Sequence, residues 1–481
     1  MRHQASLTIA SLTVAVLTVL SGCTSKPVAS GGSAASVASA PSGSGVTALR
    51  PYRETTLPNG LKILFLEDQT LPSIALSLLV KTGSAQDPEG QSGLSNLVTE
   101  LLDQGNKKRD AMGIADDLAR LGAQFDASAN YDYSTLSLTG LSFSANEVLV
   151  QFYDLATGPT FPNEEIERVK KQVIARLERG LDNPSYVADL ATLRAVYPAH
   201  PYGRTLLGAK KDVSSLSKKS VIQHYLRYYR PNNSILSVVG KFDEAYARKV
   251  EATFANWTRR DVPTSDIPVP VETAGIRLRV VDKPGLTQAQ IRFAGLGIER
   301  KDESFLALRV ANTILGGAFT SRLNDKVRKE LGLTYGISSS FDPRLQRGPF
   351  EIETFTKVDS IKQVVDETLA IYRSFIEKGV TSEEVDRAKG YLRGVFPQAI
   401  QTSERLALNL MTLRLYGLPD RYLTHYIYDL DRLSVSEINR AIRKNMKPDQ
   451  LSIVVHAPQA AVEAIKPQAS SVEVLTVDQL R

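Results

Sequence analysis

Cysteine is almost absent from this chain of 481 residues, which contains a single one, Cys23. One cysteine excludes an intrachain disulfide, a zinc site built from cysteines and a CxxC redox centre. Because Cys23 ends an N-terminal stretch that carries the marks of processing, we also exclude a thiol nucleophile. Any chemistry must therefore come from other side chains.

Histidine is scarce as well. The five histidines are His3, His200, His224, His425 and His456. No two lie within one helical turn, so the chain lacks the imidazole pair with which a zinc peptidase holds its ion on one helix. Two histidines from distant segments could still form a metal-binding pair. However, His200 lies in an HPYG loop and His456 ends a strand, which favours a structural role for each.

Long runs of one charge and several common catalytic motifs are also missing. The formal charge is +6, and the longest basic run is Lys107-Lys108-Arg109. So small a charge and so short a basic run give only weak support for nucleic-acid binding, and we predict no nucleic-acid partner. No GxSxG elbow, P-loop or dinucleotide fingerprint occurs. With 42% hydrophobic and 23% charged residues, the composition is that of a soluble globular protein with more than one domain.

Residues 1–22 resemble a secretory signal peptide. A basic start at Arg2 precedes an apolar run over residues 7–20, which is too short and wrongly flanked for a stable membrane span. The run closes with Leu20-Ser21-Gly22-Cys23, and LSGC resembles the bacterial lipobox. It predicts lipidation of Cys23. The alternative is an ordinary signal peptide with a chance cysteine.

The residues after Cys23 predict where the chain is anchored. Thr24, in place of an aspartate, resembles the pattern sent to the outer membrane. We therefore expect acyl chains on Cys23 to hold the protein at the periplasmic face of that membrane, in the cell envelope. Residues 23–48 are mainly Ser, Ala, Gly and Pro and form a flexible tether.

Beyond the tether, hydrophobic patterning alternates between strand and helix periods. Pro58-Asn59-Gly60 between apolar runs predicts a hairpin over residues 55–66. Asn163 is a candidate cap for a helix that runs to about Arg179. Other expected strands cover residues 74–80, 127–141 and 234–239, and other expected helices cover residues 93–102 and 116–121. This mixture predicts an α+β fold, with mainly antiparallel sheets covered on one face by helices.

The second part of the chain repeats the first. Residues 216–240 (LSKKSVIQHYLRYYRPNNSILSVVG) align without a gap with residues 433–457 (LSVSEINRAIRKNMKPDQLSIVVHA), a shift of 217 residues from Leu216 to Leu433. So long a shift suits duplication of a whole domain, and chance similarity of two helix-turn-strand units is the alternative. A proline-rich stretch then marks a linker. We expect related domains over residues 49–260 and 276–481, joined by residues 261–275.

Residues 321–335 (SRLNDKVRKELGLTY) combine an expected helix with the start of a strand. Apolar residues three to four apart form one helix face, Gly332 ends the helix, and alternation from Leu333 begins the strand. This arrangement brings Arg328 near Tyr335. A guanidinium fork beside a phenol could hold a peptide carbonyl or its developing oxyanion. On spacing alone, the alternative is a solvated arginine and a sheet tyrosine.

These segments together resemble the M16 family of zinc metallopeptidases, which includes insulinase, pitrilysin and mitochondrial processing peptidase. Residues 83–109 (GSAQDPEGQSGLSNLVTELLDQGNKKR) look like the family's loop and active-site helix. DNP at 182–184 and HPYG at 200–203 are similar to later signatures, and residues 315–341 look like the Arg/Tyr segment. The resemblance covers nearly everything after the tether. It implies two homologous domains with the LuxS/MPP-like metallohydrolase fold.

The resemblance carries the family's substrate-contacting arginine and tyrosine onto Arg328 and Tyr335, but it does not carry over the metal site. The family's motif is HxxEH, two zinc-binding histidines with a general-base glutamate, and a glutamate on a later helix is the third ligand. The matching positions hold Asn96, Thr99, Glu100 and Arg176. A fixed positive charge at Arg176 opposes a cation. We therefore expect no catalytic residue and no metal in this chain.

Three functional hypotheses follow from this resemblance. In the first, the chain is the non-catalytic subunit of a heteromeric peptidase and contributes Arg328 and Tyr335 in trans to a zinc-bearing HxxEH partner that degrades peptides in the envelope. In the second, it is a pseudo-peptidase that only binds peptides or scaffolds a complex. In the third, it is an enzyme with unusual ligands, although it lacks the usual means of activating water. Glu100, Asp103 and Glu178 could form an oxygen site, and solvated helix carboxylates are the alternative.

Overall fold

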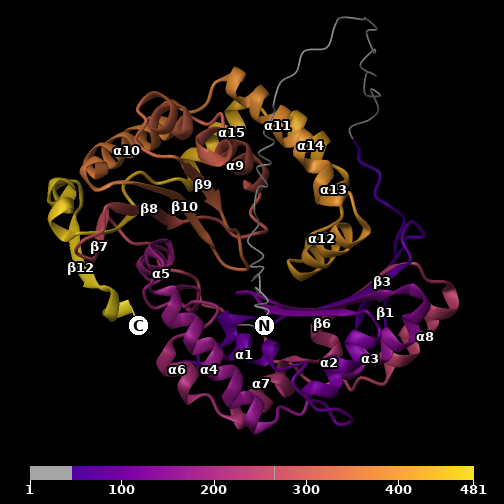
Figure 1. Ribbon diagram of the computed structural model, residues 1–481. Helices are drawn as coiled ribbons and strands as arrows, with labels where there is room; N and C mark the ends of the chain where they lie inside the picture. Colours follow the sequence, from indigo (N-terminus) through magenta and orange to yellow (C-terminus); the bar gives the residue numbers. More distant parts are fainter. Residues whose placement is uncertain (1–45, 265, 481) are drawn as a thin grey trace, which may run out of the picture. The chain divides into compact units, whose positions relative to one another are not determined.

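Two six-stranded mixed sheets organise the chain (Figure 1). The computed structural model describes residues 46–264 and 266–480, here called the first half and the second half. Both halves belong to one compact unit. The predicted signal peptide, the lipidation site Cys23 and most of the tether lie outside the described residues.

The first half forms one sheet. Its strands are β1 (Arg53–Thr56), β2 (Lys62–Glu67), β3 (Ser73–Val80), β4 (Gln124–Ala129), β5 (Ser134–Leu141) and β6 (Ser234–Gly240). They lie in the order β1-β2-β6-β3-β5-β4, and β2 and β6 run parallel. The predicted hairpin is confirmed, because β1 pairs antiparallel with β2. Its turn depends on Gly60, whose φ of +90° favours glycine.

Helices of the same half cover one face of this sheet. Alternation along β2 directs Ile63 and Phe65 toward these helices, whereas Leu64 and Leu66 face the other way, and all four are buried. The helices are α1 (Leu94–Glu100), α2 (Ala111–Arg120), α3 (Ala145–Thr157), α4 (Asn163–Gly180), α6 (Lys210–Ser215), α7 (Lys218–Tyr228) and α8 (Glu244–Ala255).

One predicted cap is wrong. Asn163 is the first residue of α4 and makes no capping hydrogen bond, because Pro162 before it is in extended conformation and takes the cap position. Asn183 caps the next helix, α5 (Pro184–Val196), by accepting from two backbone N–H groups. The DNP stretch therefore breaks one helix and starts another.

The second half builds a matching sheet. Its strands are β7 (Arg277–Asp282), β8 (Gln288–Leu296), β9 (Ile337–Phe341), β10 (Pro349–Lys357), β11 (Ser452–Ala457) and β12 (Ser471–Thr476), in the order β12-β7-β11-β8-β10-β9. Its helices are α9 (Phe305–Asn312), α10 (Ile361–Lys378), α11 (Ser382–Ile400), α12 (Ser403–Leu415), α13 (Arg421–Thr424), α14 (Tyr426–Arg432) and α15 (Val435–Asn445). No helix in the described part of the chain is long and apolar enough to cross a bilayer.

The two sheets share one plan, as the repeat predicts. The order β2-β6-β3-β5-β4 corresponds to β7-β11-β8-β10-β9, and only the outermost strands, β1 and β12, differ in direction of pairing. The aligned repeat segments form α7 with β6 and α15 with β11. Ser217 and Ser434, which align in sequence, both cap their helices with a reciprocal capping box.

One helix of each half also packs against the sheet of the other half. Helix α5 packs against β8 and β11 of the second half, and α12 packs against β2 and β6 of the first half (Figure 1). Ala191 on α5 and Leu410 on α12 are fully buried. At one of these contacts Arg292 Nε lies 2.8 Å from Asp189 Oδ1. The sequence predicted helices on one face of each sheet, and the other half supplies a helix for the second face.

Candidate functional site

The segment around Arg328 is helical but wider than an α-helix. The π-helical segment η6 (Asn324–Glu330) follows a similar one, η5 (Thr313–Gly317). Leu323 and Val327 are fully buried on one face, and Gly332 ends the turn with a φ of +62°. The predicted helix face and end are thus confirmed. Turns of the π type occur frequently at functional sites.

The strand after Gly332 begins later than the alternation predicts. It starts at Ile337, so Leu333 and Tyr335 lie outside it. The Thr334 hydroxyl donates to Gly336 O at 2.9 Å and accepts from Gly336 N–H at 3.1 Å. This local turn competes with strand pairing. As a result the Tyr335 side chain stands 86% exposed.

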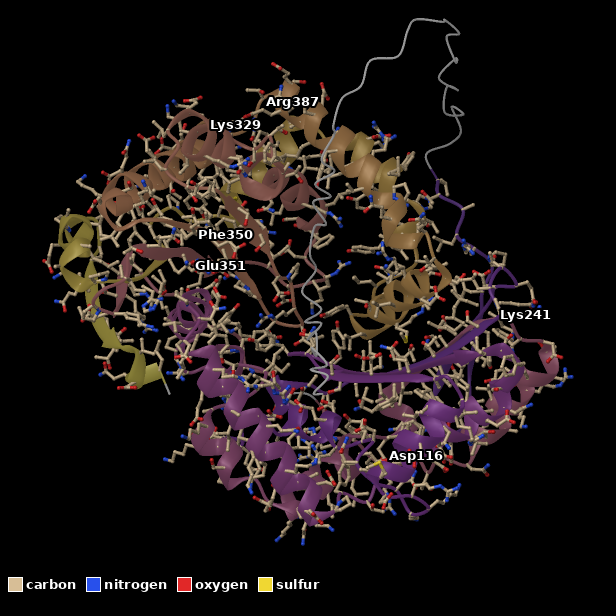
Figure 2. All side chains as sticks on the ribbon, in the orientation of Figure 1. Asp116, Lys241, Lys329, Phe350, Glu351 and Arg387 are labelled. Atoms are coloured by element: carbon tan, nitrogen blue, oxygen red, sulfur yellow. The ribbon has the colours of Figure 1, made fainter. Side chains whose placement is uncertain are left out.

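Arg328 and Tyr335 line one groove of about 570 Å³, which we call the Arg328 groove. Exposed Phe319 forms part of its wall, and the Arg328 guanidinium carbon lies 4.4 Å from the centroid of that ring. Lys329, labelled in Figure 2, is 5.5 Å from the same centroid. None of the described lining residues is acidic; they are Gln288, Phe319, Arg328, Lys329, Gly332, Leu333, Thr334, Tyr335, Phe355, Thr356, Lys357 and Ser360.

The Arg328 guanidinium contacts the Phe319 ring, and it makes no hydrogen bond or ion pair with any residue that the structure describes. A cation–π contact fixes the guanidinium plane without using its N–H donors. The donors stay available to a carbonyl or oxyanion, and Tyr335 lines the same groove. Sequence reasoning missed Phe319 and Lys357. For Phe319 a signal existed, namely an aromatic residue in the turn that follows Gly316-Gly317.

The positions that match the metal motif form a closed polar cluster on the first half. Asn96 Nδ2 donates to Glu100 Oε1 at 2.7 Å, and Arg176 Nη2 lies 2.5 Å from both oxygens of Glu100. The hydroxyl of buried Thr99 donates to Asn96 O at 2.8 Å. The guanidinium neutralises the one carboxylate that an ion would need, so these residues do not fit zinc. No residue of this cluster lines the Arg328 groove.

Four other acids and histidines that the sequence singles out make contacts of their own or are buried. Glu178 pairs with Lys210 Nζ at 2.5 Å, and burial raises the pKa of Asp103. His200 Nδ1 accepts from a backbone N–H at 3.0 Å, and His456 Nδ1 lies 2.9 Å from a backbone carbonyl. In the part of the chain that the structure describes, no three His, Cys, Asp and Glu side chains gather in a group that could hold a metal.

Comparisons with known proteins find two family models and several relatives that are similar to this chain. Residues 62–210 match the family model described as insulinase (peptidase family M16), and residues 215–392 match the model described as peptidase M16 inactive domain. A Bacillus subtilis (strain 168) protein named uncharacterized zinc protease YmxG is 25% identical over 398 residues, which cover 82% of this chain and 95% of that protein. A Helicobacter pylori protein named non-peptidase homolog YmxG is 25% identical over 401 residues, which cover 82% of this chain and 91% of that protein.

Solved structures are similar over most of the chain. The peptidase M16 inactive domain from Pseudomonas fluorescens has a TM-score of 0.79 and 28% identity, covering 85% of this chain and 98% of that one. A protease from Helicobacter pylori has a TM-score of 0.77 and 21% identity, covering 85% of this chain and all of that one. The latter supports the fold alone. The predicted α+β fold with two homologous domains is confirmed.

Proposed function

Because the chain belongs to peptidase family M16, we propose that it is the non-catalytic subunit of a two-chain peptidase. In this proposal a partner of the same family bears HxxEH, binds zinc and cleaves the peptide. This chain presents Arg328 and Tyr335 to the scissile carbonyl in trans. Peptides are the substrates of the pair, and this chain binds no metal of its own.

The observation that carries the proposal is the contrast between the two halves. The first half replaces the metal-ligand set with the Glu100–Arg176 ion pair, whereas the second half keeps an arginine whose donors are unused. An unpaired guanidinium that shares with a tyrosine a groove whose described lining has no acidic residue suits an oxygen atom that gains negative charge. A chain that had lost all catalytic use would have no need of these two side chains together.

Reconstitution tests the proposal. The mature chain is mixed with an M16 chain that carries HxxEH and is encoded beside it, and cleavage of a fluorogenic peptide is followed. We expect no turnover by this chain alone and chelator-sensitive turnover by the mixture. Arg328→Ala should lower kcat/KM by about 10²–10³-fold, the usual effect of removing one oxyanion donor. Assembly, measured by gel filtration, should be unchanged.

A matched control comes from the same segment. Lys326 pairs with Glu330 at 2.8 Å and does not line the groove, so Lys326→Ala should leave turnover intact. Equal turnover with Arg328→Ala would remove the mechanistic claim. If the genome encodes no HxxEH partner nearby and no mixture cleaves peptides, the alternative of a peptide-binding or scaffolding pseudo-peptidase is favoured.

We also propose that Cys23 anchors the complex in the cell envelope, at the periplasmic face of the outer membrane. The LSGC sequence and the tether after it support this placement. Metabolic labelling with a fatty acid should label the wild-type chain, and Cys23→Ser should abolish the label. Labelling that survives the substitution would refute the anchor.

A further inference from the structure

A second cavity, of about 440 Å³, lies where the two halves meet, and we call it the interhalf cavity. The turn between β4 and β5 supplies Asp132 and Tyr133 from the first half. The second half supplies α9, α12 and the turn between β9 and β10 (Figure 1). Asp132 joins the halves, because it accepts from Leu345 N–H at 2.8 Å and from Tyr416 O–H at 3.2 Å. None of the described lining residues belongs to the Arg328 groove.

Three arginines line the interhalf cavity: Arg300, Arg309 and Arg344. Arg344 is only 5% exposed, and its guanidinium carbon lies 3.6 Å from the centroid of the Tyr131 ring. Its Nε and Nη2 donate to Asp342 at 2.9 and 2.7 Å. Its Nη1, however, is buried and has no hydrogen-bond partner. An unpaired donor on a buried guanidinium is costly and indicates a ligand that completes it.

Arg300 also has a buried N–H donor without a partner. Its guanidinium carbon lies 4.0 Å from the centroid of the Phe305 ring and 5.6 Å from that of Tyr422, and its buried Nη1 also has no partner. No carboxylate of the described residues pairs with it. Arg309 lies close enough to repel it, and burial is the larger cause that lowers the pKa of Arg300. Two neighbouring guanidiniums without a counterion call for an anion between them.

The lining also indicates which anion fits. Three arginines face two acids, Asp132 and Asp342, so the cavity suits a single negative charge and disfavours a phosphate dianion or a nucleic acid. Apolar groups, among them Phe305, Leu308 and Phe341, leave room for a hydrophobic side chain. The volume lies within the usual range for small-ligand sites of about 300–1,000 Å³. Arg309 is exposed, which gives a ligand access to the cation.

We infer that the interhalf cavity binds the carboxyl end of a peptide, with Arg300, Arg309 and Arg344 on the terminal carboxylate and the apolar wall against the last side chain. This inference goes beyond the proposed function, since it concerns a different cavity and needs no partner chain. It gives the chain a preference for peptides with a free carboxyl terminus.

The test uses the full chain alone and three fluorescent peptides that all end in leucine and differ only as follows. One has a free carboxyl terminus, one a terminal amide, and one a terminal amide with an internal glutamate. Fluorescence anisotropy should show binding of the free acid, with the other two weaker by about 10–100-fold, as expected for a lost charged hydrogen bond. Equal affinity of acid and amide would overturn the inference. Tight binding of only the internal glutamate would do so too.

Variants assign the effect to the cavity. Arg300→Met and Arg309→Gln should each weaken binding of the free acid by about 10-fold or more and leave the amide unaffected. Arg309 is exposed, so its variant tests the site even if Arg300→Met folds poorly. Arg248→Met, on α8 and paired with Glu244, is the control and should bind as the wild type does. Competition by inorganic phosphate as strong as that by the free acid would refute a carboxylate site.

Discussion

Arg176 Nη2 lies 2.5 Å from each carboxylate oxygen of Glu100, and Asn96 Nδ2 lies 2.7 Å from one of them. Three side chains from α1 and α4 therefore converge on one point. Their geometry is that of a binding site, but their charges cancel. The ion pair links α1 to α4 and removes the negative charge that would attract a cation.

This convergence predicts that a zinc site can be restored. Asn96→His, Glu100→His and Arg176→Glu together place two imidazoles one helical turn apart and a carboxylate opposite them, which is a zinc ligand set. We expect the triple variant to retain about one equivalent of zinc after gel filtration, measured by atomic emission.

The matched control keeps the positively charged Arg176. Asn96→His with Glu100→His, in a chain that retains Arg176, should lose zinc on the column, because a fixed positive charge remains at the site. If both variants hold the ion equally well, Arg176 does not decide metal binding. If neither does, the three side chains do not converge as a ligand set requires.

Local chemistry explains which parts of the fold were predictable. The hairpin turn at Gly60, the helix end at Gly332 and the aligned caps Ser217 and Ser434 each depend on neighbouring residues, and the structure has all of them. Tyr335 was misplaced into a strand because alternation suggested pairing, whereas the Thr334 hydroxyl closes a turn first. A side-chain hydrogen bond of this kind leaves no periodic signal.

Long-range packing could not be predicted in the same way. Helices α5 and α12 have buried residues on several sides, because each lies between its own half and the sheet of the other. Such patterning indicates burial but not the partner. The interhalf cavity was missed for the same reason, since Asp132 and Arg344 are more than 200 residues apart and each alone resembles a loop residue.

The helix exchange predicts that both halves unfold together. Leu410 on α12 is fully buried in a core that includes Leu64 and Leu66 of the first sheet. Leu410→Ala should lower the free energy of unfolding by about 2–5 kcal/mol, the usual cost of such a cavity. Leu408→Ala, on the same helix but 47% exposed, should change it by no more than about 0.5 kcal/mol. Chemical denaturation followed by circular dichroism measures both, and two separated transitions would contradict the exchange.

Glu351 predicts a pH dependence of stability. This residue on β10, labelled in Figure 2, has a buried Oε1 without a hydrogen-bond partner. Its pKa is raised from 4.5 to about 7: burial is the largest cause, the Arg292 guanidinium lowers the pKa, and the charges of Asp189 and Glu353 raise it. The folded state thus binds the proton more tightly than the unfolded state. Stability is lost as the pH rises from about 4.5 to about 7, and the loss is complete above that range.

Substitution isolates this contribution. Glu351→Gln should raise the melting temperature at pH 8 by about 3–4 °C, because a pKa rise of this size corresponds to roughly 3 kcal/mol, spread over two halves that unfold together. At pH 4 it should melt with the wild type. Glu89→Gln, in an exposed loop and not among the charges that act on Glu351, is the control and should not alter the pH profile. Melting curves at pH 4, 6 and 8 test this prediction. If the melting temperature of Glu351→Gln changes with pH in parallel with that of the wild type, the prediction is wrong.

The turn at Thr334 predicts a positioning role that only the assembled peptidase reveals. Thr334 holds Gly336 on both its N–H and its carbonyl, so Thr334→Val should free the Tyr335 backbone. In the reconstituted pair we expect kcat to fall about 10-fold with KM unchanged, since the loss concerns a transition-state contact.

Ser338→Ala, which removes an exposed hydroxyl two residues beyond the turn, is the control. If Thr334 acts through Tyr335, adding Thr334→Val to Tyr335→Phe causes little further loss. Fully additive losses would mean that the turn serves stability and not the position of the phenol.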